Sequence, residues 1–150
     1  MTSRKPAIIA CVFLAVAIAG LGFAWLWVRW DTEWLRQDSE TTPTMTGEDV
    51  FMVVRVDDLQ PDDDRLAAIR TAAALSFPRS LGTIQEGETS SRTWPRAYTW
   101  YTMWIGIGDF NDAFVVEYRK RLAEELLLRN LDVRWQVGFV RHDGKVLYAD

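Results

Sequence analysis

The only histidine of the chain, His142, is the side chain whose ordinary pKa best suits general-base catalysis near neutral pH. It precedes Asp143 and Gly144, a pair typical of a two-residue hairpin turn. A catalytic histidine needs a nucleophile and an orienting acid within hydrogen-bond reach, and this turn offers only Asp143. Because polar residues are common at hairpin turns for solubility alone, we assign His142 no catalytic role.

Two groups of acidic residues could hold a cation or act as paired carboxylates. Asp57, Asp58 and residues 62–64 form a cluster, but it lacks the glycine and the closing glutamate of a calcium-binding loop. Asp109 and Asp112 could form the carboxylate pair of a hydrolase. Both groups lie at expected helix starts, where the helix dipole favours negative charge, so helix capping explains them. With one histidine and one cysteine in the chain, zinc is also disfavoured, and we predict no metal site.

Nucleotides and nucleic acids are disfavoured as ligands. The stretch "GIGDFN", residues 106–111, lies between an expected strand and an expected helix, but Asn111 occupies the third glycine position of the dinucleotide fingerprint. Residues 31–150 contain 14 basic and 21 acidic side chains, a formal charge of −7 that repels phosphates. We therefore predict no cofactor and no nucleic-acid partner.

Aromatic residues gather between residues 94 and 104. On a strand, Tyr98, Trp100 and Trp104 would share one face, and Tyr101 would take the other. One interpretation is that helices and a loop bury both faces. The other is a partner surface, because aromatic side chains are enriched at interface hot spots. On the second interpretation the partner-binding residues are Trp94, Tyr98, Trp100 and Tyr101.

An apolar run at the N-terminus predicts a membrane anchor. Residues 7–28 contain no charge and no proline over 22 positions, enough to cross a hydrocarbon layer ~30 Å thick. The run continues past "AIA", residues 17–19, which favours a retained anchor over a cleaved signal peptide. The only cysteine, Cys11, lies inside it, so the rest of the chain can form no disulfide.

Charges and tryptophans around this run predict its orientation. Basic residues resist translocation, so Arg4 and Lys5 should keep the N-terminus in the cytoplasm. We therefore expect a single-pass inner-membrane protein whose C-terminal domain lies outside the cytoplasm. Tryptophan favours the lipid headgroup region because its ring is apolar and its N–H can donate, and arginine can reach lipid phosphates from there. The membrane-interface residues are expected to be Trp25, Trp27, Arg29, Trp30 and Trp34.

The remaining chain predicts a small α+β domain behind a tether. We expect a cytoplasmic tail (1–6), an anchor (7–30), an interfacial segment and polar tether (31–49), and an exported domain (50–150). The expected elements are a strand (50–56), a helix opened by Pro61 and closed by Pro78, a loop (78–97), a strand (98–108), a helix capped by Asp109 or Asn111 and ended by Asn130, and a hairpin with Phe139 opposite Tyr148.

This order predicts a βαβαββ two-layer sandwich, with two helices on one face of a four-stranded sheet. Its layout is similar to that of small bitopic subunits of bacterial secretion and pilus assembly platforms, an analogy that assigns no site residue. We expect a non-enzymatic protein whose partners are membrane lipid and another protein, either as a subunit of a membrane machine or as an immunity or exclusion factor. The alternative is a membrane-tethered hydrolase or small-ligand-binding domain that uses the 78–97 loop and Asp109.

Overall fold

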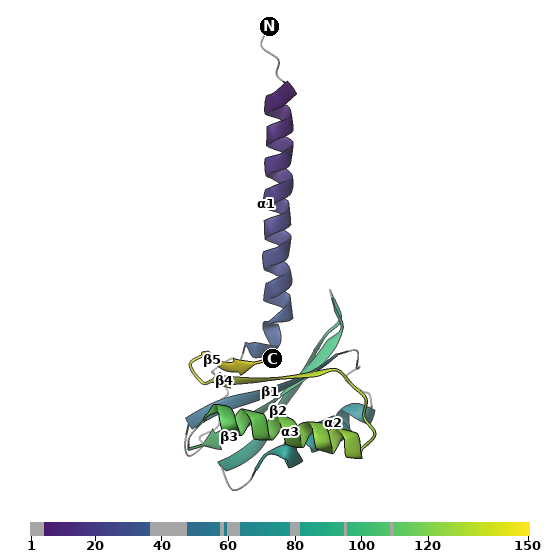
Figure 1. Ribbon diagram of the computed structural model, residues 1–150, viewed down its shortest axis with the longest axis vertical. Helices are drawn as coiled ribbons and strands as arrows, with labels where there is room; N and C mark the ends of the chain where they lie inside the picture. Colours follow the sequence, from purple (N-terminus) through teal and green to yellow (C-terminus); the bar gives the residue numbers. More distant parts are fainter. Residues whose placement is uncertain are drawn as a thin grey trace. The chain divides into compact units, whose positions relative to one another are not determined.

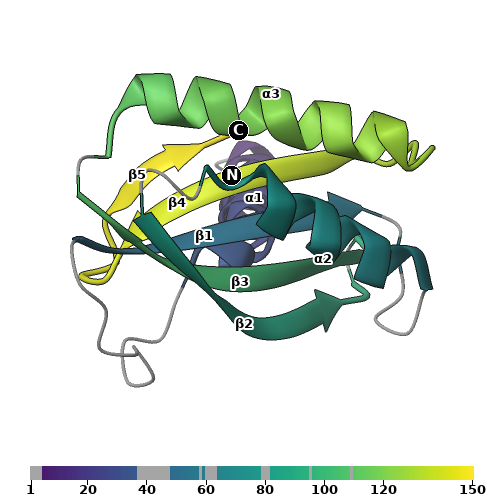
Figure 2. The ribbon, with the colours of Figure 1, turned by 90° about the horizontal axis from the view of Figure 1, so that it is seen from below.

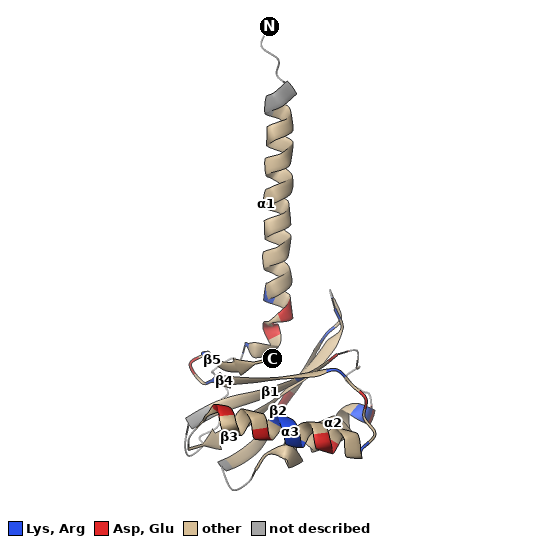
Figure 3. Ribbon diagram, viewed as in Figure 1, with Lys and Arg blue, Asp and Glu red and all other residues tan. Residues whose placement is uncertain are grey.

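The N-terminal unit of the chain is one long apolar helix. The computed structural model describes residues 5–36, 48–57, 59, 64–78, 82–94, 96–108 and 110–150 (Figure 1). It divides into two units, Met1–Glu33 and Trp34–Asp150. Helix α1 (Lys5–Asp31) is coloured as charged only near its C-terminal end (Figure 3), and an 18-residue window within Ile8–Asp31 has a mean hydropathy of 2.5. By length and composition it is compatible with a transmembrane or signal anchor.

The second unit is a five-stranded antiparallel sheet with two helices packed on one face (Figure 2). The strand order is β2-β3-β1-β4-β5, and every neighbouring pair is antiparallel. The elements are η1 (Glu33–Leu35), β1 (Glu48–Asp57), α2 (Asp64–Ser76), β2 (Gly82–Arg92), β3 (Tyr98–Ile107), α3 (Asp112–Leu128), β4 (Trp135–Arg141) and β5 (Val146–Ala149). The order of β1 to β4 is that of the split β-α-β arrangement, with β5 added at the edge.

The mixed α+β architecture is confirmed, but the four-stranded sheet is wrong. Residues expected to form a loop, 78–97, contain the edge strand β2 (Gly82–Arg92), which pairs with β3. Its sequence "GTIQEGETSSR" is polar because most of its side chains are exposed. An edge strand needs one neighbour only and carries no apolar alternation, so its composition resembles that of a loop.

The main core lies between the sheet and the helices. Two apolar stripes at helical spacing are buried: Leu66, Ile69, Ala73 and Phe77 on and just after α2, and Phe114, Tyr118, Leu122 and Leu126 on α3. They pack against Val50, Met52, Val54 and Val56 of β1. The buried Tyr118 hydroxyl donates to the Ala73 carbonyl oxygen at 3.0 Å, so a hydrogen bond also joins the two helices.

The ends of α3 confirm the capping residues. The Asn111 side chain accepts from the Phe114 amide at 3.0 Å, and Asn130 adopts φ 56° after the last turn. The other N-cap candidate, Asp109, lies outside the described residues, as do Pro61, Asp62 and Asp63 at the expected start of α2.

The C-terminal hairpin has the predicted register but a different turn. Phe139 pairs with Tyr148, as expected. The Gly144 amide donates to the Arg141 carbonyl at 2.8 Å and the Arg141 amide to the Lys145 carbonyl at 2.9 Å, so the loop contains three residues, 142–144. Gly144 alone in this loop has a positive φ, 82°. The two-residue turn is therefore wrong, and a three-residue loop with a bulge at Gly144 replaces it.

Gly144→Val is expected to lower the free energy of unfolding by about 1 to 2 kcal/mol, because a β-branched residue resists a positive φ. Thermal unfolding of the full chain in detergent measures the effect. Gly108→Val is the control, because Gly108 is exposed and a Cβ there meets nothing within 4 Å. Equal stability of the two variants would contradict the role of Gly144 in the turn.

Candidate functional site

The four predicted partner-binding aromatics occupy different environments. Trp94, between β2 and β3, is 63% exposed, whereas Tyr98 and Tyr101 are both buried and Trp100 is half-buried. Tyr98 and Trp100 lie on the sheet face opposite the helices, and Tyr101 lies in the helix-side core, as the strand spacing predicts. Of these four rings, only Trp94 and part of Trp100 are available to a partner.

The sheet face opposite the helices carries a second core built around Trp34. Trp34 is 2% exposed and packs with Val53 and Tyr98, and Leu35 and Trp100 lie against them. Trp34, which we expected at the membrane interface, is instead packed in the core of the domain, after α1 has ended at Asp31. The predicted tether between it and β1 lies outside the described residues from 37 to 47.

The remaining membrane-interface candidates lie on α1. Trp25 and Trp27 are exposed, Trp30 is half-buried, and the Arg29 guanidinium lies 5.4 Å from the centre of the Trp25 ring. This arginine–tryptophan contact suits a headgroup region, where the ring can be apolar and the cation can face phosphate. Their role at an interface stays a prediction.

Gly138 makes the close approach of Trp34 possible. It lies on β4, opposite Val53 of β1. A Cβ at this position would lie 2.9 Å from Cζ3 of Trp34 and closer still to Cδ2 of Leu35. Only a residue without a side chain leaves room for these two groups, so the glycine fixes where the segment that follows α1 attaches to the domain.

Buried charge lies beside this contact. Arg55 of β1 is 2% exposed, and its Nε donates to Asp57 Oδ1 at 3.1 Å. Asp57 Oδ2 accepts from Nη2 of the more exposed Arg96 at 2.7 Å. The Arg55 guanidinium also lies 4.1 Å from the centre of the Tyr98 ring and 6.0 Å from that of Trp34. One carboxylate thus joins two guanidinium groups, and two aromatic rings lie against the buried one.

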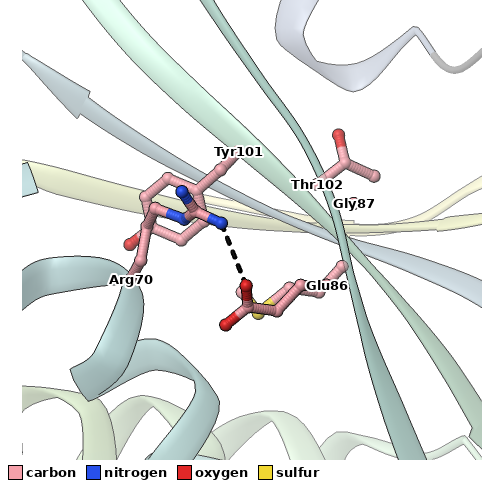
Figure 4. A pocket seen from close by; sticks show the side chains of 6 residues that line it. Arg70, Glu86, Gly87, Tyr101 and Thr102 are labelled. Atoms are coloured by element: carbon pink, nitrogen blue, oxygen red, sulfur yellow. Dashed lines mark hydrogen bonds and ion pairs between the residues drawn. The ribbon is translucent and has the colours of Figure 1, made fainter. Parts of the chain in front are cut away.

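A small cavity lies on the helix side of β2 and β3 (Figure 4). Its volume is about 10 Å³, enough for about one water. At its mouth Arg70 Nη2 donates to Glu86 Oε2 at 3.0 Å. Among the described residues the Tyr101 hydroxyl has no hydrogen-bond partner, and burial raises the pKa of this phenol well above its usual value. A neutral phenol beside a cavity of this size suits a structural role better than a catalytic one.

The described side chains considered for catalysis lie on separate elements, and Asp109 lies outside the described residues. His142 is exposed in the hairpin loop, and Asp112 is exposed in the first turn of α3. Asp143 accepts from Arg141 and from the Lys145 amide, and these bonds lower its pKa to about 2. The carboxylate is therefore ionised at neutral pH and has no proton to donate. In the described part of the chain, no group of three or more metal-binding side chains is found.

An exposed apolar face on α3 was missed by the sequence analysis. Val116, Leu127 and Leu128 are 68%, 80% and 79% exposed. Val116 and Leu127 lie on the same side of the helix, three turns apart, and the exposed Ala123 lies between them. The run "LLL", residues 126–128, could have indicated this face. Because Leu126 belongs to the core stripe, Leu127 and Leu128 must point away from the core.

Comparison with known proteins assigns no family. No family model matches the chain, and no curated protein matches it. Among solved structures, a phage SAM lyase in complex with S-methyl-5'-thioadenosine has a TM-score of 0.39 and 10% identity, covering 74% of this chain and 94% of that one. The phage SAM lyase in its apo state has a TM-score of 0.40 and 11% identity, and the match covers 72% of this chain and 91% of that one. A putative amidohydrolase/peptidase from Burkholderia cenocepacia has a TM-score of 0.38 and 14% identity, and the match covers 71% of this chain and 29% of that one. This similarity is too low to carry a functional argument.

Proposed function

We propose that the chain is a single-pass inner-membrane protein whose exported domain binds another protein. In this proposal α1 is a retained anchor with a cytoplasmic N-terminus, and the outward face of α3 is the protein-binding surface. The supporting observation is the exposure of Val116, Leu127 and Leu128 on one helix. Val116 and Leu127 lie on one side of α3 with the exposed Ala123 between them, and an exposed apolar stripe of this kind is typical of protein interfaces.

The composition around this face suits a partner that binds and releases. Glu117, Lys120, Arg121 and Glu124 lie beside the aliphatic side chains on α3. An apolar centre with a charged rim is the usual anatomy of such interfaces. The alternative, a membrane-tethered hydrolase or small-ligand domain, gains no support from the Arg70 cavity, which has room for about one water.

One cysteine variant tests both parts of the proposal. We replace Cys11 with serine and Leu127 with cysteine, and expect a membrane-impermeant maleimide to label position 127 in spheroplasts, because the domain is exported. A photoreactive group attached to the same cysteine should then crosslink to a protein in native membranes. Thr83→Cys, exposed on β2, is the matched control and should be labelled without giving that product.

The contribution of the aliphatic side chains is measured separately. With the photoreactive group at position 127, Val116→Glu should reduce the crosslinked product about tenfold or more, since truncation of hot-spot residues costs about 2 kcal/mol. Failure of the maleimide to reach either cysteine before lysis would contradict export. Labelling without any crosslink that depends on Val116 would contradict the α3 surface and leave export standing.

A further inference from the structure

The edge strand β5 is open on its outer side. It is the last strand in the sheet order, and among the described strands it pairs only with β4. Its sequence "VLYA", residues 146–149, contains no charge, proline or glycine, and the Val146 side chain is 46% exposed. The other edge strand, β2, carries Glu86, Glu88 and Arg92, charges of the kind that discourage pairing. β5 is therefore the edge that can accept a further strand.

The backbone of β5 allows two copies to pair symmetrically. The Asp150 amide donates to a β4 carbonyl at 3.3 Å, and Tyr148 pairs with β4 two residues before it. Because backbone groups alternate in direction along an antiparallel strand, those of Leu147 and Ala149 turn to the open edge. A two-fold axis at Tyr148 would place Leu147 of each copy opposite Ala149 of the other, so that each pair can exchange two hydrogen bonds.

The exposed aliphatic side chains of α3 lie on the same side of the domain as this edge. Figure 2 shows α3 along the β5 side of the sheet, and the Arg119 guanidinium lies 5.9 Å from the centre of the Tyr148 ring. Tyr118 projects from the other side of the helix, where its hydroxyl reaches α2. At 3.6 residues per turn, Val116 and Leu127 belong to the flank next to Arg119, directed away from Tyr118. One neighbour at the β5 edge could therefore cover both features.

A second copy of this chain fits both features at once. A two-fold axis at the β5 edge would continue the sheet from one copy into the other and set the two α3 helices side by side and antiparallel. In the alignment that places Val116 against Leu127 of the second copy, Lys120 lies level with Glu124 of that copy, and symmetry repeats the pair. Building on the proposed function, we infer that the partner of the α3 surface is a second copy of this chain, bound through β5 and α3 about a two-fold axis.

The same symmetry suits two chains anchored in one membrane. Trp34 packs on the sheet face opposite the helices, and only Thr32 and Glu33 separate it from the last residue of α1. A two-fold axis perpendicular to the sheet keeps that face on the same side in both copies. With α1 as the anchor of the proposed function, both chains enter the paired domains from one side, as two proteins in one membrane must.

A mixed disulfide tests the pairing of the two β5 strands. In the Cys11→Ser background, a tagged full chain carries Leu147→Cys and an untagged full chain carries Ala149→Cys, and the two are co-expressed and oxidised in native membranes. The mixed disulfide should form in excess of either symmetric disulfide, because the two-fold axis sets these two positions opposite each other. Thr83→Cys, exposed on the other edge strand, is the matched control and should give no disulfide.

Charge reversal tests the contact between the two α3 helices. When both chains carry Lys120→Glu, or both carry Glu124→Lys, the mixed disulfide should fall about fivefold, because the symmetric pairs now repel. When one chain carries Lys120→Glu and the other Glu124→Lys, opposite charges meet again across the axis and the yield should recover. This recovery separates a contact between copies from the pair that Lys120 and Glu124 could form within one helix. Thermal unfolding in detergent confirms that each variant is folded.

The photoreactive group at position 127 gives a second readout, and its crosslinked product should have the mass of two chains. A product with a different protein that depends on Val116, without the mixed disulfide, would overturn the second copy and leave the proposed binding surface standing. Absence of both products would overturn the proposed surface, and the dimer with it. A disulfide at Thr83→Cys equal in yield to the mixed one would overturn pairing through β5 in favour of β2.

Discussion

Trp34→Ala is expected to lower the free energy of unfolding of the domain by about 3 to 5 kcal/mol, the usual cost of truncating a buried aromatic side chain. Trp34 is 2% exposed and fills the space over Val53 beside Tyr98. Denaturant unfolding of the full chain in detergent, followed by near-UV circular dichroism, measures the loss. Trp27→Ala on α1 is the control and should leave unfolding of the domain unchanged. Equal stability of the two variants would place Trp34 outside the core.

A double-mutant cycle tests whether Gly138 exists to admit this ring. Gly138→Ala should cost about 1 to 3 kcal/mol, because its Cβ would lie 2.9 Å from Trp34 Cζ3 and closer still to Leu35 Cδ2. In the Trp34→Ala background the same change should cost much less, since the methyl group can occupy space that the ring has left. Gly108→Ala, with open space around it, should be neutral in both backgrounds. Strictly additive costs would mean that Gly138 and Trp34 do not interact.

Periodic elements were the part of the fold that the sequence could predict. Leu66 and Ile69 repeat at helical spacing on α2, as Phe114, Tyr118 and Leu122 do on α3, so their burial follows from the pattern. β2 has no such pattern because it is an edge strand with solvent on most of its side chains. The turn residues of the last hairpin were recognised. The sequence "HDG" can form either a two-residue or a three-residue loop, so the sequence alone could not decide the loop length.

The site was harder to predict because its contacts join distant parts of the chain. Alternation on β3 assigned Trp100 and Tyr101 to opposite faces correctly. It could not show that Trp34 covers the face opposite the helices, since Trp34 follows an apolar helix and belongs to no periodic element of the domain. Trp34 was grouped with the expected membrane-interface residues because of its residue type, but α1 ends at Asp31. By contrast, the exposed side of α3 was implied once Leu126 was placed in the core.

Asp57→Ala is expected to cost about 3 kcal/mol or more, because it takes a carboxylate away from a buried guanidinium group. Asp57 and Arg55 are 10% and 2% exposed, with Arg55 Nε 3.1 Å from Asp57 Oδ1. The matched control is Glu117→Ala, which removes an ion pair of 2.7 Å to Arg121 whose side chains are 46% and 45% exposed. Exposed pairs of this kind contribute little to stability, because water and salt screen the two charges. We therefore expect Asp57→Ala to lower the denaturant midpoint more than Glu117→Ala, because the first pair is buried, although the second pair is the shorter one.

The large cost should come from the charge left behind rather than from the bond itself. Arg55→Met removes that charge and keeps a long apolar side chain against Tyr98 and Trp34, so the double variant with Asp57→Ala should be more stable than Asp57→Ala alone. Arg96 would then lose its partner at the surface, where water can solvate it at little cost. A double variant no more stable than Asp57→Ala would mean that Asp57 acts on the backbone of β1 or on Arg96, and that the buried charge of Arg55 is compensated by other groups.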